Sequence, residues 1–344
     1  MKAGLLTAIR EVALGEMPDP KPGPGDVLVA VRSVGVCGSD LHYYLRGCIG
    51  SQVVEEFPFV LGHEAAGEVV AVGPDVRKLR PGDRVAVEPG IPCGECEPCV
   101  TGRYNLCRAV RFLGTPPVHG AYCEYLAVPE RYAHPLPPEL SYDEGAMIEP
   151  LAIGLFASDL AAIQPGYSVA ILGAGSIGLV TLMSALAAGA GPVFVSEPLD
   201  ARREAAKRLG ATQVLNPRTD PVVDAILDAT DGRGVDVVFE AAGSVEAHQQ
   251  MVEVVRPAGT IVPIGSCAEE LVPLPLASFR RKGVEVRFVR RFCHTYPRAI
   301  GLAQSGKANL SALVTHRFPL EDLAGAFRLL EDYSDGVIKP VVTL

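Results

Sequence analysis

Four cysteines lie close together between residues 93 and 107. Cys93, Cys96, Cys99 and Cys107 have the spacing C-x2-C-x2-C-x7-C, in a stretch that also contains glycine and proline. A flexible backbone of this kind can wrap four thiolates around one tetrahedral Zn²⁺. Because the protein fills all four ligand positions, no place is left for water or substrate, and we expect a structural zinc. The alternative, surface thiols that bind no metal, is disfavoured by the length of the pattern.

A second set of possible metal ligands is spread more widely. Cys37 in "GVCGSD" offers a thiolate, His63 in "VLGHEAAG" an imidazole, and Glu64 or Glu149 a carboxylate. Such a mixed set leaves one coordination position open, as a catalytic zinc requires. Taken singly, a buried cysteine is usually a small hydrophobic residue, and a histidine is often only hydrogen-bonded. The residues leave open which glutamate binds the metal.

The stretch "VAILGAGSIGL" joins an apolar strand pattern to a helical one through Gly173, Gly175 and Gly178. Gly173 permits a tight turn, Gly175 lets a pyrophosphate approach the backbone, and Gly178 lets helix and strand pack closely. The phosphates would bind at the helix N-terminus, and we include Ile177 of this turn among the cofactor-binding residues. The pattern predicts a dinucleotide site.

An acidic residue follows at the distance typical of such sites. Glu197 lies nineteen residues beyond Gly178, at the end of the apolar run "PVFVSE". Its carboxylate is expected to bind both hydroxyls of the adenosine ribose and to repel a 2′-phosphate, which favours NAD over NADP. Arg202, which we include in the cofactor site, and Arg203 would soften that preference. The alternative is that Glu197 is an ordinary carboxylate at a strand end.

The composition indicates the framework that must position these residues. The chain has 344 residues, 48% of them hydrophobic, which suffices for a large core and usually means two domains. With 31 basic and 40 acidic residues the net charge is −9, and no basic run favours nucleic-acid binding. Arg10 and Glu11 interrupt the N-terminal apolar stretch, unlike a secretion signal, so we expect a cytoplasmic protein whose nine cysteines form no disulfide framework.

Residues 167–196 contain no charged side chain and could span a bilayer. The glycine spacing favours a buried strand and its helix instead, and strand and helix patterns alternate onward through "GVDVVFEAAG" and "GTIVPIG". We therefore predict an α/β fold with a doubly wound parallel sheet of the Rossmann type.

Longer motifs extend nearly from end to end. They include "VLGHEAAGEVVAVG", "LRPGDRVAVEPG", "IEPLAIG", "GAGSIGLVT", "FCHTYPRAI" and "LVTHRFPLE". In these motifs the chain resembles the zinc-dependent medium-chain dehydrogenases, and among them the polyol (sorbitol) dehydrogenase branch. The resemblance implies a mainly β, GroES-like catalytic domain at residues 1–152 and 291–344, around a Rossmann NAD-binding domain at 153–290. It also implies a homotetramer.

The resemblance implies roles for individual residues. Cys37 and His63 would be ligands of the catalytic zinc, with Glu64 a direct ligand in the polyol branch and Glu149 the neighbouring carboxylate. Ser39 would hydrogen-bond the substrate oxygen. The remaining expected positions are a proton relay at His42 and a substrate pocket lined by Tyr43, Arg291 and Phe292. Two departures bear on the substrate: Cys48 stands where related enzymes often have a larger polar residue, and His294 and Tyr296 fall at variable positions.

The activity implied is oxidation of a polyol such as sorbitol or xylitol to a ketose, with hydride transfer to NAD⁺ and two zinc ions per chain. A threonine or vicinal-diol (butanediol) dehydrogenase would share every zinc and NAD residue and differ only in the pocket. A non-catalytic NAD-binding structural protein would need the glycine motif but not Cys37, Ser39 and His63 together.

Overall fold

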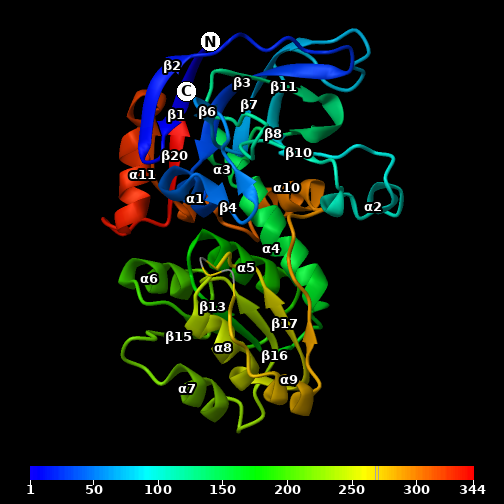
Figure 1. The fold of residues 1–344 in the computed structure, drawn as a ribbon. Coiled ribbons are helices and arrows are strands. Elements are labelled where there is room, and N and C mark those ends of the chain that lie inside the picture. The colour runs from blue at the N-terminus through cyan, green and yellow to red at the C-terminus, as the bar shows by residue number, and fades with distance from the viewer. Residues whose placement is uncertain (268, 270) are drawn as a thin grey trace. The chain divides into compact units, whose positions relative to one another are not determined.

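The computed structural model describes residues 1–267, 269 and 271–344, and the chain divides into two units. Unit 1 comprises Met1–Glu149, Tyr296–Gln304 and Leu310–Leu344, and unit 2 comprises Pro150–Thr295 and Ser305–Asn309. The main boundaries lie three and five residues from those expected at 152/153 and 290/291. Both chain ends, blue and red in Figure 1, belong to unit 1.

Unit 1 is built mainly from antiparallel strands. Its main sheet runs in the order β12 (Ala133–Pro135), β8 (Arg84–Val87), β7 (Glu64–Val72), β3 (Asp26–Gly35), β20 (Lys339–Thr343) and β19 (Val314–Pro319), and β11 (Tyr125–Pro129) also pairs with β3. A smaller sheet joins β2 (Glu11–Glu16), β1 (Lys2–Ala8) and β6 (Phe59–Val60). Two short ribbons pair β4 (Cys48–Ile49) with β5 (Gln52–Val53) and β9 (Gly90–Ile91) with β10 (Arg111–Phe112).

The core of unit 1 lies against β3, where Val27, Val29 and Val31 alternate with residues that face the other way. Phe327 of the C-terminal helix stacks on Tyr44 and extends this core. The helices of the unit are α1 (Gly38–Arg46), α2 (Glu97–Val100), α3 (Tyr142–Ala146), α10 (Tyr296–Gln304) and α11 (Leu323–Asp332), and its 3₁₀ turns are η1 (Tyr104–Leu106), η2 (Glu130–Tyr132), η3 (Leu310–Ala312) and η4 (Leu320–Asp322). Helix α4 (Ile148–Ala161) begins in unit 1 and continues into unit 2.

Unit 2 contains a parallel sheet. Its order is β15 (Gln213–Leu215), β14 (Val193–Ser196), β13 (Val169–Leu172), β16 (Val235–Glu240), β17 (Val255–Pro263) and β18 (Glu285–Val286). The chain builds outward from β13 first to one side and then to the other, which is the doubly wound order of the Rossmann fold. The connecting helices are α5 (Ser176–Ala187), α6 (Asp200–Arg208), α7 (Val222–Asp228), α8 (Val245–Val254) and α9 (Leu276–Lys282).

The uncharged stretch at 167–196 forms β13, α5 and β14. Every residue of β13 and of β16 is buried, as expected for parallel strands that are covered by helices. Among the described residues, none of the helices combines the length and the apolar character that a membrane crossing needs. The predicted α/β class, with a Rossmann sheet in one domain and a second, mainly β domain, is confirmed.

Candidate functional site

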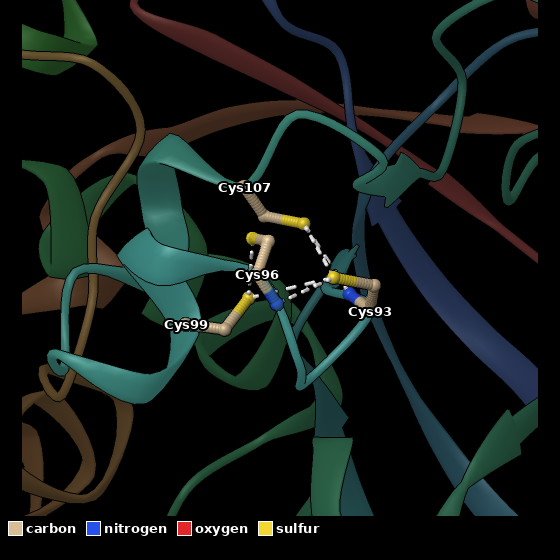
Figure 2. A group of neighbouring side chains, drawn as sticks. All are labelled: Cys93, Cys96, Cys99 and Cys107. Carbon is tan, nitrogen blue, oxygen red and sulfur yellow. Dashed lines mark hydrogen bonds between the residues drawn. The ribbon is translucent and has the colours of Figure 1, made fainter.

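The four cysteines of the loop at residues 93–107 turn their sulfurs toward one another (Figure 2). The sulfurs of Cys96 and Cys99 are 3.4 Å apart, those of Cys107 and Cys93 3.5 Å, and those of Cys93 and Cys99 3.9 Å. A tetrahedral Zn²⁺ with Zn–S bonds of about 2.3 Å needs sulfur separations of about 3.8 Å. All four thiols are free, since a disulfide would bring two sulfurs to about 2.05 Å. The geometry fits a closed zinc cage.

Turns and a short helix shape this loop. Gly94 and Gly102 have φ angles of +82° and +79°, at bends where a side chain would be strained. Cys96 caps the N-terminus of α2. The backbone N–H groups of Glu95 and Cys96 lower the pKa of Cys93 to about 6, and the Cys107 thiol adds to the effect. The thiolate, which is the metal-binding form, is thereby favoured.

A buried carboxylate ties the loop to the main sheet. Glu88, directly after β8, accepts a hydrogen bond of 3.1 Å from the Tyr104 hydroxyl, and Tyr104 lies within the cysteine loop. The other carboxylate oxygen of Glu88 lies 2.8 Å from Nε2 of His134 in β12. The His134 ring packs at 4.9 Å on that of Tyr296, whose hydroxyl donates to the carbonyl of Val87. Tyr296, expected at a variable position, is therefore a buried residue of unit 1.

Cys37, His63 and Glu64 form the second group of possible ligands. One ligand atom from each lies within 4.8 Å of the others. Cys37 caps the N-terminus of α1, His63 precedes β7 and Glu64 opens it, and the pairing of Gly35 with Glu64 brings the two segments together. Thiolate, imidazole and carboxylate are zinc ligands, and three of them leave one position open. The group has the composition that a catalytic zinc would need.

Asp40 lies behind this group and is buried. Its Oδ1 is 3.5 Å from Nδ1 of His63 and accepts from the Gly62 N–H at 3.1 Å, while Oδ2 accepts from the Cys37 N–H at 3.0 Å and from the Tyr122 hydroxyl at 3.1 Å. Burial lowers the pKa of His63, but the charges of Asp40 and Cys37 outweigh burial and raise that pKa well above its usual value. A carboxylate bonded to a ligating histidine orients the ring and makes it a better ligand.

A buried lysine holds the carboxylate of Glu64. The Nζ of Lys339, a residue of β20 that is only 1% exposed, lies 2.7 and 2.8 Å from the two carboxylate oxygens. The same ammonium donates to the carbonyl of Val36 at 3.1 Å, one residue before Cys37. Burial lowers the pKa of Lys339, but Glu64 and Cys37 raise it overall, so the ammonium stays charged. A cation of the chain itself therefore neutralises Glu64.

Glu149, the other candidate carboxylate, lies in the first turn of α4 and is buried. It does not belong to the group of three ligand atoms within 4.8 Å. Burial raises the pKa of Glu149 to about 7, against the opposing charge of His63, and the charge of Glu64 raises it further. Glu64 thus has the geometry of a direct ligand together with Cys37 and His63, whereas Glu149 interacts with the group through its charge.

Helix α1 carries three residues with expected roles. Ser39 and His42 are half-buried and lie one turn apart, on the helix that begins after Cys37. Burial lowers the pKa of His42, and a neighbouring arginine lowers it further. Tyr43 is buried and packs in the core of unit 1. The other two expected pocket residues lie in unit 2, where Phe292 is buried and Arg291 has a φ of +52°.

In unit 2 the glycine turn has the geometry of a phosphate cradle. Gly173 has a φ of +102°, and a Cβ there would lie 2.6 Å from the backbone nitrogen of Ala242. A Cβ on Gly178 would collide with the carbonyl oxygen of Gly173. Gly175 precedes α5, and a Cβ there would lie 3.7 Å from Nη1 of Arg202, the nearest contact among the residues that the structure describes. The space beside Gly175 is open at a helix N-terminus, where a pyrophosphate fits.

Glu197 lies directly after β14, close to this turn. Its Oε2 accepts from the Ala174 N–H at 2.8 Å, its Oε1 accepts from the Leu199 N–H at 3.0 Å, and Arg203 donates to its backbone carbonyl. Each carboxylate oxygen keeps a lone pair that a ribose hydroxyl could use. Ile177, in the first turn of α5, is half-buried.

Two residues of the site were not predicted from the sequence. Asp40 had a usable signal, because it stands three residues after Cys37 at the start of a helix, where a carboxylate accepts from the N-cap N–H. Lys339 had none, because it lies 275 residues from Glu64 and reaches it only through the pairing of β20 with β3.

Two family models match the chain. One describes an alcohol dehydrogenase GroES-like domain and covers residues 23–138, and the other describes a zinc-binding dehydrogenase and covers residues 176–305. The sorbitol dehydrogenase of Bacillus subtilis is 40% identical over 342 residues, or 99% of this chain and 97% of that protein.

Two solved structures have the same fold over the whole chain. A zinc-binding dehydrogenase of Sinorhizobium meliloti bound to NADP has a TM-score of 0.91 at 33% identity and covers 100% of this chain and 99% of its own. The 2R,3R-butanediol dehydrogenase of Bacillus subtilis has a TM-score of 0.91 at 32% identity, with the same coverage. The chain belongs to the zinc-dependent medium-chain dehydrogenases and is an oxidoreductase.

Proposed function

We propose that the protein oxidises a secondary alcohol of a polyol, such as sorbitol or xylitol, to a ketose with NAD⁺. The observation that carries the proposal is the group of half-buried Cys37 with buried His63 and Glu64. Asp40 and Lys339 lie around it. Similarity to a sorbitol dehydrogenase over nearly the full length supports the substrate class. When bound, a zinc in this group would supply a Lewis acid for the alcohol oxygen, and NAD⁺ would accept the hydride.

The chain's own residues would bind the alcohol and remove its proton. The Oγ of Ser39, two residues after Cys37, would accept the hydrogen bond of the reacting hydroxyl and take its proton. His42, one turn further along α1, would receive a proton from Ser39 at a ring nitrogen. The lowered pKa of His42 supports this role, because it keeps the imidazole neutral and able to accept near pH 7.

The cofactor would bind to unit 2. The N-terminus of α5 and the open space at Gly175 support pyrophosphate binding. Glu197, buried beside the glycine turn, supports NAD over NADP because its carboxylate would repel a 2′-phosphate. Because the Sinorhizobium meliloti relative was solved with NADP bound, the preference of this protein for NAD or NADP must be measured directly.

The four cysteines would hold a second zinc. Their sulfur separations support a site with every position filled by protein, which can stabilise the loop but cannot bind substrate. The proposed content is therefore two zinc ions per chain, one in each group.

A vicinal-diol dehydrogenase is the second candidate, favoured by similarity to the butanediol dehydrogenase. Both substrate types place a second hydroxyl beside the reacting one, and the carboxyl group of Glu149, which is not one of the three grouped ligands, would offer an acceptor for it. A long polyol has further hydroxyls that butanediol lacks, so the two functions differ in how much of the pocket is used.

The test is a substrate screen with parallel metal analysis. The zinc-loaded protein should reduce NAD⁺ with sorbitol or xylitol at a higher kcat/KM than with 2,3-butanediol or threonine, and NADP⁺ should be the poorer acceptor. A preference for butanediol would replace the polyol by the second candidate. No reduction with any alcohol in a protein that holds zinc and binds NADH would indicate a non-catalytic NAD-binding protein.

A further inference from the structure

Glu240 ends β16 at the point where the strand order of unit 2 changes direction. From β13 the sheet extends through β14 and β15 on one side and through β16, β17 and β18 on the other. Glu240 pairs in register with Leu172, the residue before Gly173. Open parallel sheets bind ligands beyond the carboxyl ends of their strands at such a point. Glu240 is thus a buried carboxylate at the cofactor edge without a role in the function proposed above.

Glu240 joins the two loops on its side of this point. Its Oε1 accepts from the backbone N–H groups of Ala242 at 2.9 Å and Gly243 at 2.7 Å, in the loop that follows β16. Its backbone carbonyl accepts from the N–H groups of Ile264 at 2.8 Å and Gly265 at 3.0 Å, in the loop that follows β17. The side chain of Glu240 thus holds the loop after β16, and its backbone holds the loop after β17.

These loops contact the glycine turn and each other through backbone atoms. A Cβ on Gly173 would lie 2.6 Å from the nitrogen of Ala242, and a Cβ on Gly243 would lie 2.6 Å from the carbonyl oxygen of Ser266. A Cβ on Gly265 would lie 2.5 Å from the nitrogen of Gly243. Since no side chain separates the three turns, a shift of the loop after β16 must move its neighbours as well.

His248 lies at the second carboxylate oxygen of Glu240. Among the described residues this Oε2 has no hydrogen-bond partner, and Nε2 of His248 is 3.6 Å away. Nδ1 of His248 lies 2.8 Å from the carbonyl of Ser244, one turn earlier along α8, which fixes the ring. Burial raises the pKa of Glu240, and the charge of His248 opposes that rise. The histidine therefore limits how the carboxylate can turn.

We propose that Glu240, held by His248, is a positioning residue for the half of the dinucleotide beyond the pyrophosphate, its second ribose and the nicotinamide. A doubly wound sheet binds one mononucleotide with each half of its strands. Glu197 after β14 faces the adenosine half, so the loops after β16 and β17 belong to the other half. The inference rests on the proposed function in one respect, because it assumes that a nicotinamide dinucleotide is the ligand.

The test compares NADH with AMP, which contains only the adenosine half. In Glu240→Gln the side chain keeps its size and one acceptor oxygen but loses its charge. We expect the Kd for NADH, from a fluorescence titration, to rise about tenfold, the factor for one lost contact to a charged group. The Kd for AMP, from calorimetry, should not change. His248→Gln should also raise the Kd for NADH, but by a smaller factor. In the double variant, His248→Gln should add nothing to the effect of Glu240→Gln, because His248 acts through Glu240.

Asp236→Asn is the matched control. Asp236 is a buried carboxylate at the other end of β16, bonded to Ser168, Arg233 and Arg256. Its loss should lower thermal stability and leave the ratio of the NADH and AMP affinities unchanged. The proposal is overturned if Glu240→Gln weakens the binding of NADH and AMP equally, or weakens neither. If Glu240→Gln does not fold, the same comparison of NADH and AMP affinities in His248→Gln decides the question. A wild-type protein that binds neither NADH nor AMP would instead remove the proposed function.

Discussion

The two groups of metal-binding side chains in unit 1 are assembled in different ways. The four cysteines lie within one loop, and short local turns bring their sulfurs to 3.4–3.9 Å. Cys37 and the pair His63 and Glu64 come from two segments that meet only because β3 pairs with β7. The first group therefore depends on the conformation of its own loop, whereas the second depends on the pairing of two strands of the main sheet.

The charges around the two groups differ as well. The cysteine loop is partly exposed, and backbone N–H groups favour the thiolate at Cys93. In the second group His63 and Glu64 are buried together with the Asp40 carboxylate, Cys37 is half-buried, and the Lys339 ammonium touches Glu64. Burying charge is costly unless it is paired, so this group needs compensation from the chain even without metal. Similar ligands can therefore serve stability in one place and reactivity in another.

The largest expected effect comes from Cys37→Ser, which replaces a thiolate in the open group by a weak hydroxyl ligand. One zinc per chain should be lost, and kcat/KM for a polyol should fall by at least about 100-fold, since even indirect partners of zinc ligands cost 10–100-fold. NADH should still bind, because its proposed contacts lie in unit 2. Metal analysis, a polyol assay and an NADH titration on one preparation measure all three.

Cys123→Ser is the control for this variant, because Cys123 is buried in the same unit but belongs to neither group. It should keep both zinc ions and its turnover. If Cys37→Ser turns over at the wild-type rate with one zinc missing, the open group is not the catalytic centre.

Cys96→Ser should have the opposite signature. The loop would lose its zinc, and because a structural zinc contributes folding free energy directly, Tm should fall by roughly 10 °C or more. Molecules that remain folded should keep the other zinc and their kcat. Calorimetric melting, zinc content and an assay per folded molecule check this, with Cys48→Ser as the control. A variant that retains both zinc ions and its Tm would rule out the cage.

Lys339→Met sharpens the contrast in charge. It leaves the Glu64 carboxylate buried without its cation, so the metal-free protein should lose about 3–5 kcal/mol of unfolding free energy. The double variant with Glu64→Gln should regain much of this loss, because both charges are then gone. Denaturant unfolding of the four metal-free proteins gives the coupling energy. Equal stability of the single and double variants would mean that Lys339 does not compensate Glu64.

What the sequence could predict follows the same division between local and distant contacts. The cysteine spacing and the Gly173 turn are local patterns, and the α/β class with its Rossmann sheet was predicted correctly. Cys37, His63 and Glu64 were predicted from residue type and family resemblance, and the structure brings them together. Lys339 could not be predicted, because its contact with Glu64 depends on strand order. The packing of Tyr43 in the core depends on residues that are distant in the sequence, so local sequence patterns do not predict it.

Asp40→Asn should have the smallest effect. This variant keeps the zinc ligand His63 but changes the residue that orients its ring. The groups around the Asp40 carboxylate are donors, the N–H groups of Cys37 and Gly62 and the Tyr122 hydroxyl, with His63 Nδ1 at 3.5 Å. An amide nitrogen in place of one oxygen would face donors and leave them unpaired. The His63 ring would then be poorly held, and zinc affinity of the open group should fall about 10–100-fold.

Competition with a chelator measures this affinity separately for the two zinc ions. The cysteine loop should release its zinc at the wild-type chelator concentration, because none of its ligands contacts Asp40. Asp143→Asn is the control, since Asp143 is a carboxylate of the same unit that accepts from Ser33 and Arg317 instead. Excess zinc should restore most of the turnover of Asp40→Asn, because the ligand His63 is still present and only poorly oriented. It should not restore the turnover of Cys37→Ser, because that variant lacks the thiolate ligand. Equal loss of both zinc ions in Asp40→Asn would show that the two groups depend on each other, against the independence inferred here from their separate assembly.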